Sequence, residues 1–101
     1  MEFKVLIAET AIADLKEIVE FVAHDDQNAA ARVGEKLVEN AMRLATMPER
    51  FPLHDSSRGI RKMSSSPFLI FYTADQREGV VNVLHFWHGA RRTPRFSNPT
   101  K

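Results

Sequence analysis

The feature that most constrains the fold is an unbroken run of five apolar residues, Phe68–Tyr72, three of which are aromatic. A strand with one exposed face alternates apolar and polar residues, so a run without alternation is typical of a central strand covered on both faces. We predict neighbouring strands at Ile60–Ser65 and Val80–Trp87, with a turn over Asp75–Gly79. Three consecutive strands with short links predict an antiparallel meander.

The N-terminal half predicts one strand and two helices. Residues Glu2–Ile7 are rich in strand-forming side chains, and apolar residues then recur at helical spacing over Ala11–Ala23 and Ala29–Thr46. In the first helix we expect Asp14 on the polar face, away from the apolar stripe. Pro48 ends the second helix, because the residue before a proline is pushed out of helical geometry.

The predicted order is β-α-α-β-β-β, an α+β fold in which a helical hairpin packs on one face of an antiparallel sheet. The segment Met47–Gly59, which holds two prolines, is predicted as a loop. A chain of 101 residues fits a single domain, which we place at residues 1–96, with a short basic tail at residues 97–101.

Composition narrows the classes of function. With no cysteine, the chain has no disulfide framework, no thiolate metal site and no cysteine nucleophile. No apolar run approaches the roughly 18 residues of a membrane span, and the N-terminus does not resemble a secretory signal. We therefore expect a soluble cytoplasmic protein without cofactor, metal or membrane partner.

The net charge of +1 conceals an asymmetry. Residues 1–57 carry six Lys or Arg and eleven Asp or Glu, a balance of −5, whereas residues 58–101 carry eight and two, a balance of +6. This pattern fits either an anionic partner of the later segment, nucleic acid or an acidic protein, or a solvated charged surface.

Several short motifs occur in a characteristic order over about 90 residues. They are A-x-x-D-L-x-x-I from Ala11 to Ile18, an alanine-rich second helix, G-I-R at Gly59–Arg61, the Phe71–Tyr72 pair, and V-x-V-L-H followed by H-G-A-R-R from Val81 to Arg92. In this order the chain resembles the ParE/RelE toxin superfamily of type II toxin–antitoxin modules, and the ParE branch most closely.

The resemblance implies a small toxin that a cognate antitoxin holds inactive in a hetero-oligomer. ParE-like members, known as plasmid stabilisation proteins, inhibit DNA gyrase, whereas RelE-like members are ribosome-dependent mRNA endoribonucleases. Where RelE-like members carry a central-strand arginine, this chain has Leu69, which cannot hold a phosphate. We therefore favour a ParE-like gyrase inhibitor that is not an enzyme, with ribosome and mRNA as the alternative targets.

The resemblance also implies site residues. We expect Arg61 on the sheet face opposite the helices, either as a target-binding residue or as an ordinary surface arginine. Ile18 and Phe21, at the margin of the first apolar stripe, and Val22, within the stripe and otherwise a core residue, are expected to bind the antitoxin. The other candidates are, for target binding, His88, Arg91, Arg92 and Arg95, and, for a nuclease, Arg61, His85, His88 and Arg91, with Glu49 as a possible base.

Overall fold

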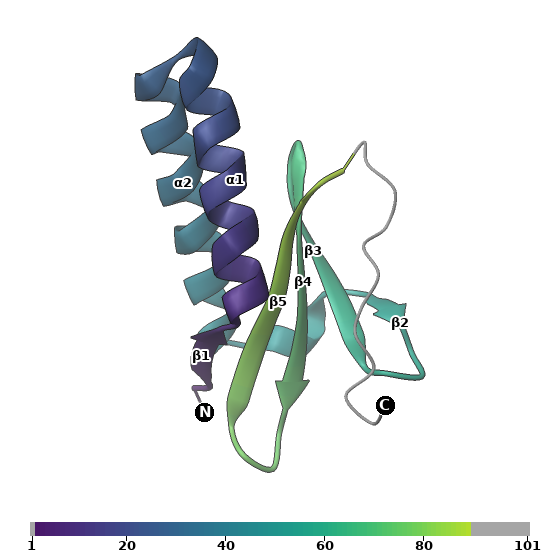
Figure 1. Cartoon of the computed structure of the whole chain (residues 1–101). Coiled ribbons are helices and arrows are strands. Elements are labelled where there is room, and N and C mark those ends of the chain that lie inside the picture. Colours follow the sequence, from purple (N-terminus) through teal and green to yellow (C-terminus); the bar gives the residue numbers. More distant parts are fainter. Residues whose placement is uncertain (1, 90–101) are drawn as a thin grey trace.

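The computed structural model describes residues 2–89, which comprise two α-helices, two short 3-10 helices and five strands (Figure 1). The elements are β1 (Lys4–Ile7), α1 (Glu9–Asp25), α2 (Gln27–Met42), η1 (Arg43–Ala45), η2 (Pro48–Arg50), β2 (Leu53–Asp55), β3 (Ile60–Ser65), β4 (Phe68–Asp75) and β5 (Val80–His88). This arrangement confirms the predicted α+β fold with a helical hairpin beside a sheet. The predicted boundary between domain and tail lies outside the described residues.

The sheet is mixed and has the strand order β1-β5-β4-β3-β2. Strands β3 to β5 form the predicted antiparallel meander, which β2 extends, whereas β1 pairs with β5 in parallel, from Lys4 opposite Val80 to Ile7 opposite Val83. The sheet is therefore not wholly antiparallel. After β1 at one edge of the sheet, the helical hairpin and the segment that follows it lead the chain to β2 at the opposite edge. The fifth strand, β2, is a three-residue segment within the predicted loop, and its pairing with β3 is irregular.

The turns and caps follow the expected chemistry. Asp26 caps α2, its side chain accepting a hydrogen bond from the backbone N–H of Ala29 at 3.1 Å. Asp75 accepts backbone hydrogen bonds in the β4–β5 turn, which closes at Gly79 with a φ of +67°. Thr10, at the start of α1, donates its hydroxyl to the carbonyl of Leu84 on β5 at 2.7 Å.

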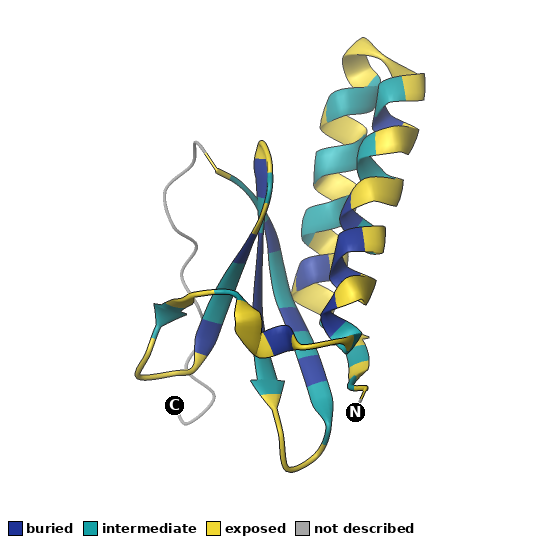
Figure 2. Ribbon diagram, turned by 180° about the vertical axis from the view of Figure 1, so that it is seen from behind, coloured by how far each residue is buried: buried dark blue, intermediate teal, exposed yellow. Residues whose placement is uncertain are grey.

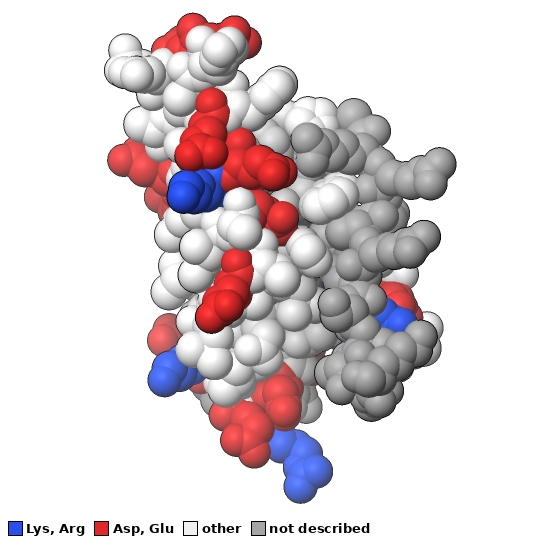
Figure 3. All heavy atoms as spheres, viewed as in Figure 1, with Lys and Arg blue, Asp and Glu red and all other residues white. Residues whose placement is uncertain are grey.

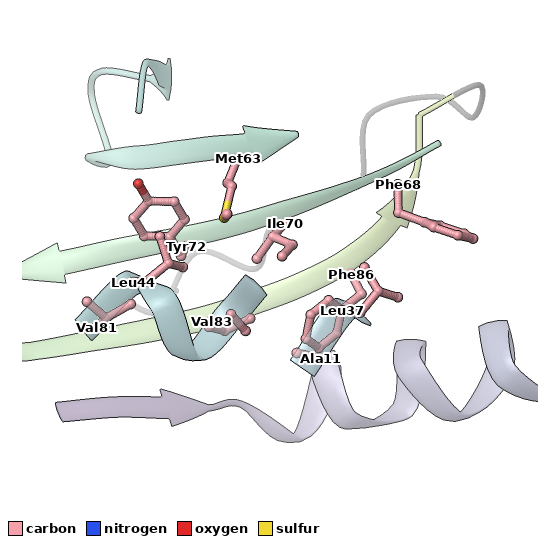
Figure 4. Packing of buried hydrophobic residues seen from close by; sticks show 11 residues of the cluster. Ala11, Leu37, Leu44, Met63, Phe68, Ile70, Tyr72, Val81, Val83 and Phe86 are labelled. Atoms are coloured by element: carbon pink, nitrogen blue, oxygen red, sulfur yellow. The ribbon is translucent and has the colours of Figure 1, made fainter. Parts of the chain in front are cut away.

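The hydrophobic core lies between the hairpin and one face of the sheet (Figure 4). Because successive side chains of a strand point to opposite faces, Phe68, Ile70 and Tyr72 share one face of β4, and in this core they face the helices. Phe68 lies at one end of the cluster, away from Leu44 and Tyr72 at the other end (Figure 4). The core therefore ends at Phe68.

Candidate functional site: an apolar groove beside the helical hairpin

An apolar groove of about 540 Å³ lies between α1 and the ends of β4 and β5. The hairpin and the sheet are close together near β1 and diverge toward the α1–α2 turn (Figure 1). Residues of α1 form one wall: Asp14, Glu17, Ile18, Phe21 and Val22. The sheet and its β3–β4 turn form the other: Pro67, Phe68, Phe86, Trp87 and His88.

On the α1 wall Phe21 is exposed, whereas Ile18 and Val22 are half-buried and Ile18 also packs against the core. Ala11 is the one buried residue of α1, and half-buried and exposed residues alternate along the rest of the helix (Figure 2). At about 100° per residue, Ile18, Phe21 and Val22 share a face with Asp14. Phe21 is 76% exposed although it lines an apolar groove. The groove thus brings together the three residues predicted to bind an antitoxin.

The sheet wall carries aromatic side chains that sequence reasoning did not assign to a site. His88, predicted as a target-binding residue, stacks edge-to-face on Phe68 with ring centroids 5.4 Å apart. Trp87 lines the groove as well and lies edge-to-face with His85 at 5.8 Å. The closely spaced aromatic and histidine residues at the end of β5 were the available sequence signal for this wall.

Asp14 lies at the edge of the groove and joins α1 to β5. Its Oδ2 accepts a hydrogen bond from the Phe86 backbone N–H at 3.2 Å and lies 2.6 Å from Nδ1 of His85. Both side chains are about five-sixths buried, with 17% of Asp14 and 16% of His85 exposed. The expectation that Asp14 lies on the polar face of the helix was wrong. Its side chain instead accepts a hydrogen bond from the backbone of β5, at Phe86, beyond the residues of β5 that pair with β1.

Burial raises the pKa of Asp14, although the hydrogen bond and charge of His85 and the Phe86 N–H all act to lower it. The net direction shows that desolvation of the carboxylate outweighs its partners. His85, a candidate nuclease residue, is thereby engaged in a structural contact between α1 and β5.

Arg61 lies on the helix side of the sheet, so its expected position on the opposite face was wrong. In the β3–β4 register Arg61 is opposite Tyr72 and two residues from Met63, and both of these residues belong to the core. Its Nη1 donates to the backbone carbonyls of Glu49 at 3.1 Å and Phe51 at 2.6 Å. The guanidinium therefore fastens the η2 segment to β3.

Among the described residues, the candidate nuclease residues Arg61 and His88 lie far apart. Arg61 is opposite Tyr72 and His88 is opposite Phe68, so four residues of β4, about 13 Å, separate the two positions. Glu49 lies near Arg61, but its Oε1 accepts a hydrogen bond from Gln76 at 2.6 Å. Arg91, Arg92 and Arg95 lie outside the described residues.

On the sheet face away from the helices, Leu69 is half-buried and pairs with Ser64 and Trp87. Phe71 is 1% exposed, with the His54 ring edge-to-face at 4.9 Å. Phe71 is therefore buried and forms no exposed apolar patch on this face.

Within residues 2–89 no three His, Asp or Glu side chains are grouped as a metal site requires. No helix of this described part is long and apolar enough to cross a membrane.

The fold is that of small toxin domains. The chain is similar to a structure of the RelBE2 toxin–antitoxin complex from Mycobacterium tuberculosis, with a TM-score of 0.68 and 22% identity over 87% of this chain and 99% of that one. It is similar to a structure of the chromosomal ParDE toxin–antitoxin system from P. aeruginosa, with a TM-score of 0.71 and 16% identity over 86% and 96% of the two chains. At these identities the likeness shows the fold alone.

The sequence itself assigns the family. The model of the ParE toxin of the type II toxin–antitoxin system parDE matches residues 5–93, and the chain belongs to this family. No curated protein sequence matches the chain significantly.

Proposed function

We propose that the chain is the toxin of a type II toxin–antitoxin module, that it inhibits DNA gyrase in the cytoplasm, and that a cognate antitoxin keeps it inactive in a hetero-oligomer. The observation that carries the proposal is the apolar groove with Phe21 exposed at its edge. Large apolar side chains left uncovered beside a preformed groove are typical of surfaces that a partner segment covers.

The antitoxin contacts are proposed at Ile18, Phe21 and Val22. These residues present one face of α1 to the groove, opposite the aromatic side chains of Phe68 and Trp87. An amphipathic segment with apolar side chains at helical or strand spacing would bury both walls at once. The groove is the candidate site for the inhibited state of the toxin.

Gyrase inhibition is favoured over mRNA cleavage by the positions of the nuclease candidates. RNA cleavage without a metal needs a base, an acid and a cation that converge on one phosphate. Here Arg61 is bound to backbone carbonyls, His85 contacts Asp14, and the central strand has Leu69 instead of an arginine. The remaining proposed contacts with gyrase are His88 and the arginines Arg91, Arg92 and Arg95.

The groove is tested with two matched substitutions on α1. Phe21→Ser removes a groove side chain, whereas Ile12→Ser removes a large apolar side chain that is 54% exposed and lies about 160° around the helix from Asp14. Trp87, the one tryptophan of the chain, lies in the groove and reports its occupation by fluorescence.

On titration with the product of the neighbouring gene, we expect Phe21→Ser to lose about 2 kcal/mol or more of binding free energy, as an interface anchor does. Ile12→Ser should bind like the wild type. Equal loss in both variants, or no loss in Phe21→Ser, would place the antitoxin elsewhere.

The target is tested with the isolated chain. Gyrase inhibition predicts filamentation and DNA-damage signalling on induction in bacteria, and loss of DNA supercoiling by purified gyrase. Immediate arrest of translation with cleaved mRNA would instead support the ribosome-dependent endoribonuclease.

A further inference from the structure

A second recess, of about 320 Å³, opens on the α2 side of the hairpin. Arg32 and Lys36, one helical turn apart on α2, form its basic rim, and Ser65 at the end of β3 and Ser66 in the following turn line it from the sheet. Both basic residues are exposed. Among the described residues the ion pairs are Arg43 with Glu39, Arg58 with Asp55, and His85 with Asp14, so neither rim residue has a carboxylate partner there.

The recess meets the apolar groove beneath the hairpin. Three residues, Val33, Pro67 and Phe68, line both. The two cavities therefore adjoin, and Arg32 and Lys36 lie on the side of the recess that the groove does not share.

The two openings have opposite charge. On the α1 side the groove is bordered by Asp14 and Glu17, and α1 as a whole carries five acidic residues and one lysine. Red carboxylates accordingly outnumber blue cations over α1 in Figure 3. On the α2 side the rim residues are Arg32 and Lys36, while the serine hydroxyls that line the recess can donate hydrogen bonds.

We infer that the Arg32–Lys36 rim binds carboxylates of the peptide segment that fills the groove, and so fixes the direction in which that segment crosses the toxin. The inference rests on the proposed function, since it requires the groove to hold an antitoxin segment. The segment carries apolar side chains at its centre, acidic side chains where it leaves between α2 and the β3–β4 turn, and no acidic cluster at the α1 opening.

An acidic peptide fits this surface better than a nucleic acid does. A phosphate backbone would have to follow an apolar channel and approach the carboxylates of α1, whereas a peptide buries its apolar side chains and places single charges at the rim. Opposite charges across an interface also raise the association rate and disfavour the reversed orientation.

The test compares two double charge reversals in the full chain. Arg32→Glu with Lys36→Glu inverts the rim. Lys4→Glu with Arg77→Glu changes the same residue types at exposed positions, on β1 and in the β4–β5 turn, outside both openings. The dissociation constant of the neighbouring gene's product is measured through Trp87 fluorescence at several salt concentrations, and binding of a single-stranded RNA is measured in parallel.

We expect the rim reversal to weaken antitoxin binding about tenfold or more at low salt, with the difference shrinking as salt screens the charges. The control reversal should change it less than about threefold. If the rim reversal binds normally while Phe21→Ser does not, this inference is wrong and the proposed groove remains. If neither change affects binding, the proposed antitoxin site itself is wrong. Loss of RNA binding with antitoxin binding unchanged would overturn the assignment to a peptide.

Discussion

Nδ1 of His85 lies 2.6 Å from Oδ2 of Asp14, joining the strand that ends in the groove to the helix that forms its wall. The contact lies where β1 no longer pairs with β5 and where the β4–β5 ladder shifts register between Phe71 and Tyr72. Thr10 and Asp14 of α1 bind the Leu84 carbonyl and the Phe86 N–H of this unpaired stretch. Helix side chains thus substitute for the missing strand and hold α1 at the angle that leaves the groove open.

Asp14 should contribute to the stability of the fold at acid pH rather than at neutral pH. Because burial raises its pKa above the ordinary value of 3.8, its contribution to stability is present in full below pH 3.8 and is lost as pH rises through its folded pKa. Asp14→Asn, which keeps an acceptor for the Phe86 N–H, should remove this loss. Urea unfolding at a series of pH values, followed by Trp87 fluorescence, measures the difference between variant and wild type.

Asp55 provides a control of opposite sign. Its pKa is lowered, chiefly by the hydrogen bond from Ser57, so its contribution is present above pH 3.8 and is lost as pH falls through its folded pKa. Asp55→Asn should therefore reduce the loss of stability as the pH falls, whereas Asp14→Asn should reduce the loss of stability as the pH rises. Two variants with the same pH profile would show that neither carboxylate acts as its surroundings indicate.

The parts of the fold that depend on local pattern could be predicted from sequence. The run Phe68–Tyr72 indicated a central strand, and β4 spans this run between β3 and β5. Strand β2 could not be predicted, because three residues with an irregular pairing leave no periodic signal. The parallel direction of β1 was also missed, since nothing local to Lys4–Ile7 specifies which strand edge receives it.

Of the two walls of the candidate site, only the wall formed by α1 could be predicted from the sequence. Phe21 lies at the margin of an apolar stripe, which marks an exposed anchor in sequence. Whether Trp87 and His88 face that anchor depends on the angle between hairpin and sheet, which is a tertiary property. Asp14 and Arg61 were misplaced for the same reason, since each satisfies backbone groups distant in sequence.

Tyr72, the one tyrosine of the chain, should titrate as a buried phenol. It is fully buried and donates a hydrogen bond to the Pro48 carbonyl, and burial raises its pKa to about 12. Its contribution to stability is therefore present in full below about pH 10 and is lost as pH rises through about 12. Ultraviolet absorbance of the phenolate should follow Tyr72 alone, at about 12 in the folded chain and near 10 in urea.

Tyr72→Phe separates the hydrogen bond from the aromatic packing. The variant should lose about 1 kcal/mol of stability at neutral pH, as is usual for one hydrogen bond, and should lack the alkaline loss described above. Ionisation of the folded wild type near pH 10 would show that the phenol is accessible to water.

Arg61 should matter for stability more than for target binding. Arg61→Ala leaves the Glu49 and Phe51 carbonyls without their donor and should cost about 1–3 kcal/mol in urea unfolding. Arg77→Ala, an exposed control in the β4–β5 turn, should stay within about 0.5 kcal/mol of the wild type. An Arg61→Ala protein with normal stability but no toxicity would restore Arg61 as a target-binding residue.

The last prediction is that Arg91 and Arg92 matter more for toxicity than either histidine does. His85 is engaged with Asp14, His88 stacks on Phe68, and Leu69 supplies no phosphate clamp, so proton-transfer groups have no substrate site to serve. Guanidinium groups, by contrast, can bind carboxylates or phosphates of a target through paired hydrogen bonds. Arg91→Ala with Arg92→Ala should abolish growth arrest on induction.

The matched histidine variant combines His85→Asn with His88→Gln. The asparagine amide can replace Nδ1 of His85 as the donor to Asp14, so the contact between α1 and β5 is kept while the titrating ring is removed. This variant should still arrest growth, and circular dichroism should show both proteins folded. A folded histidine variant that is harmless, beside an arginine variant that still arrests growth, would replace gyrase inhibition with the nuclease alternative.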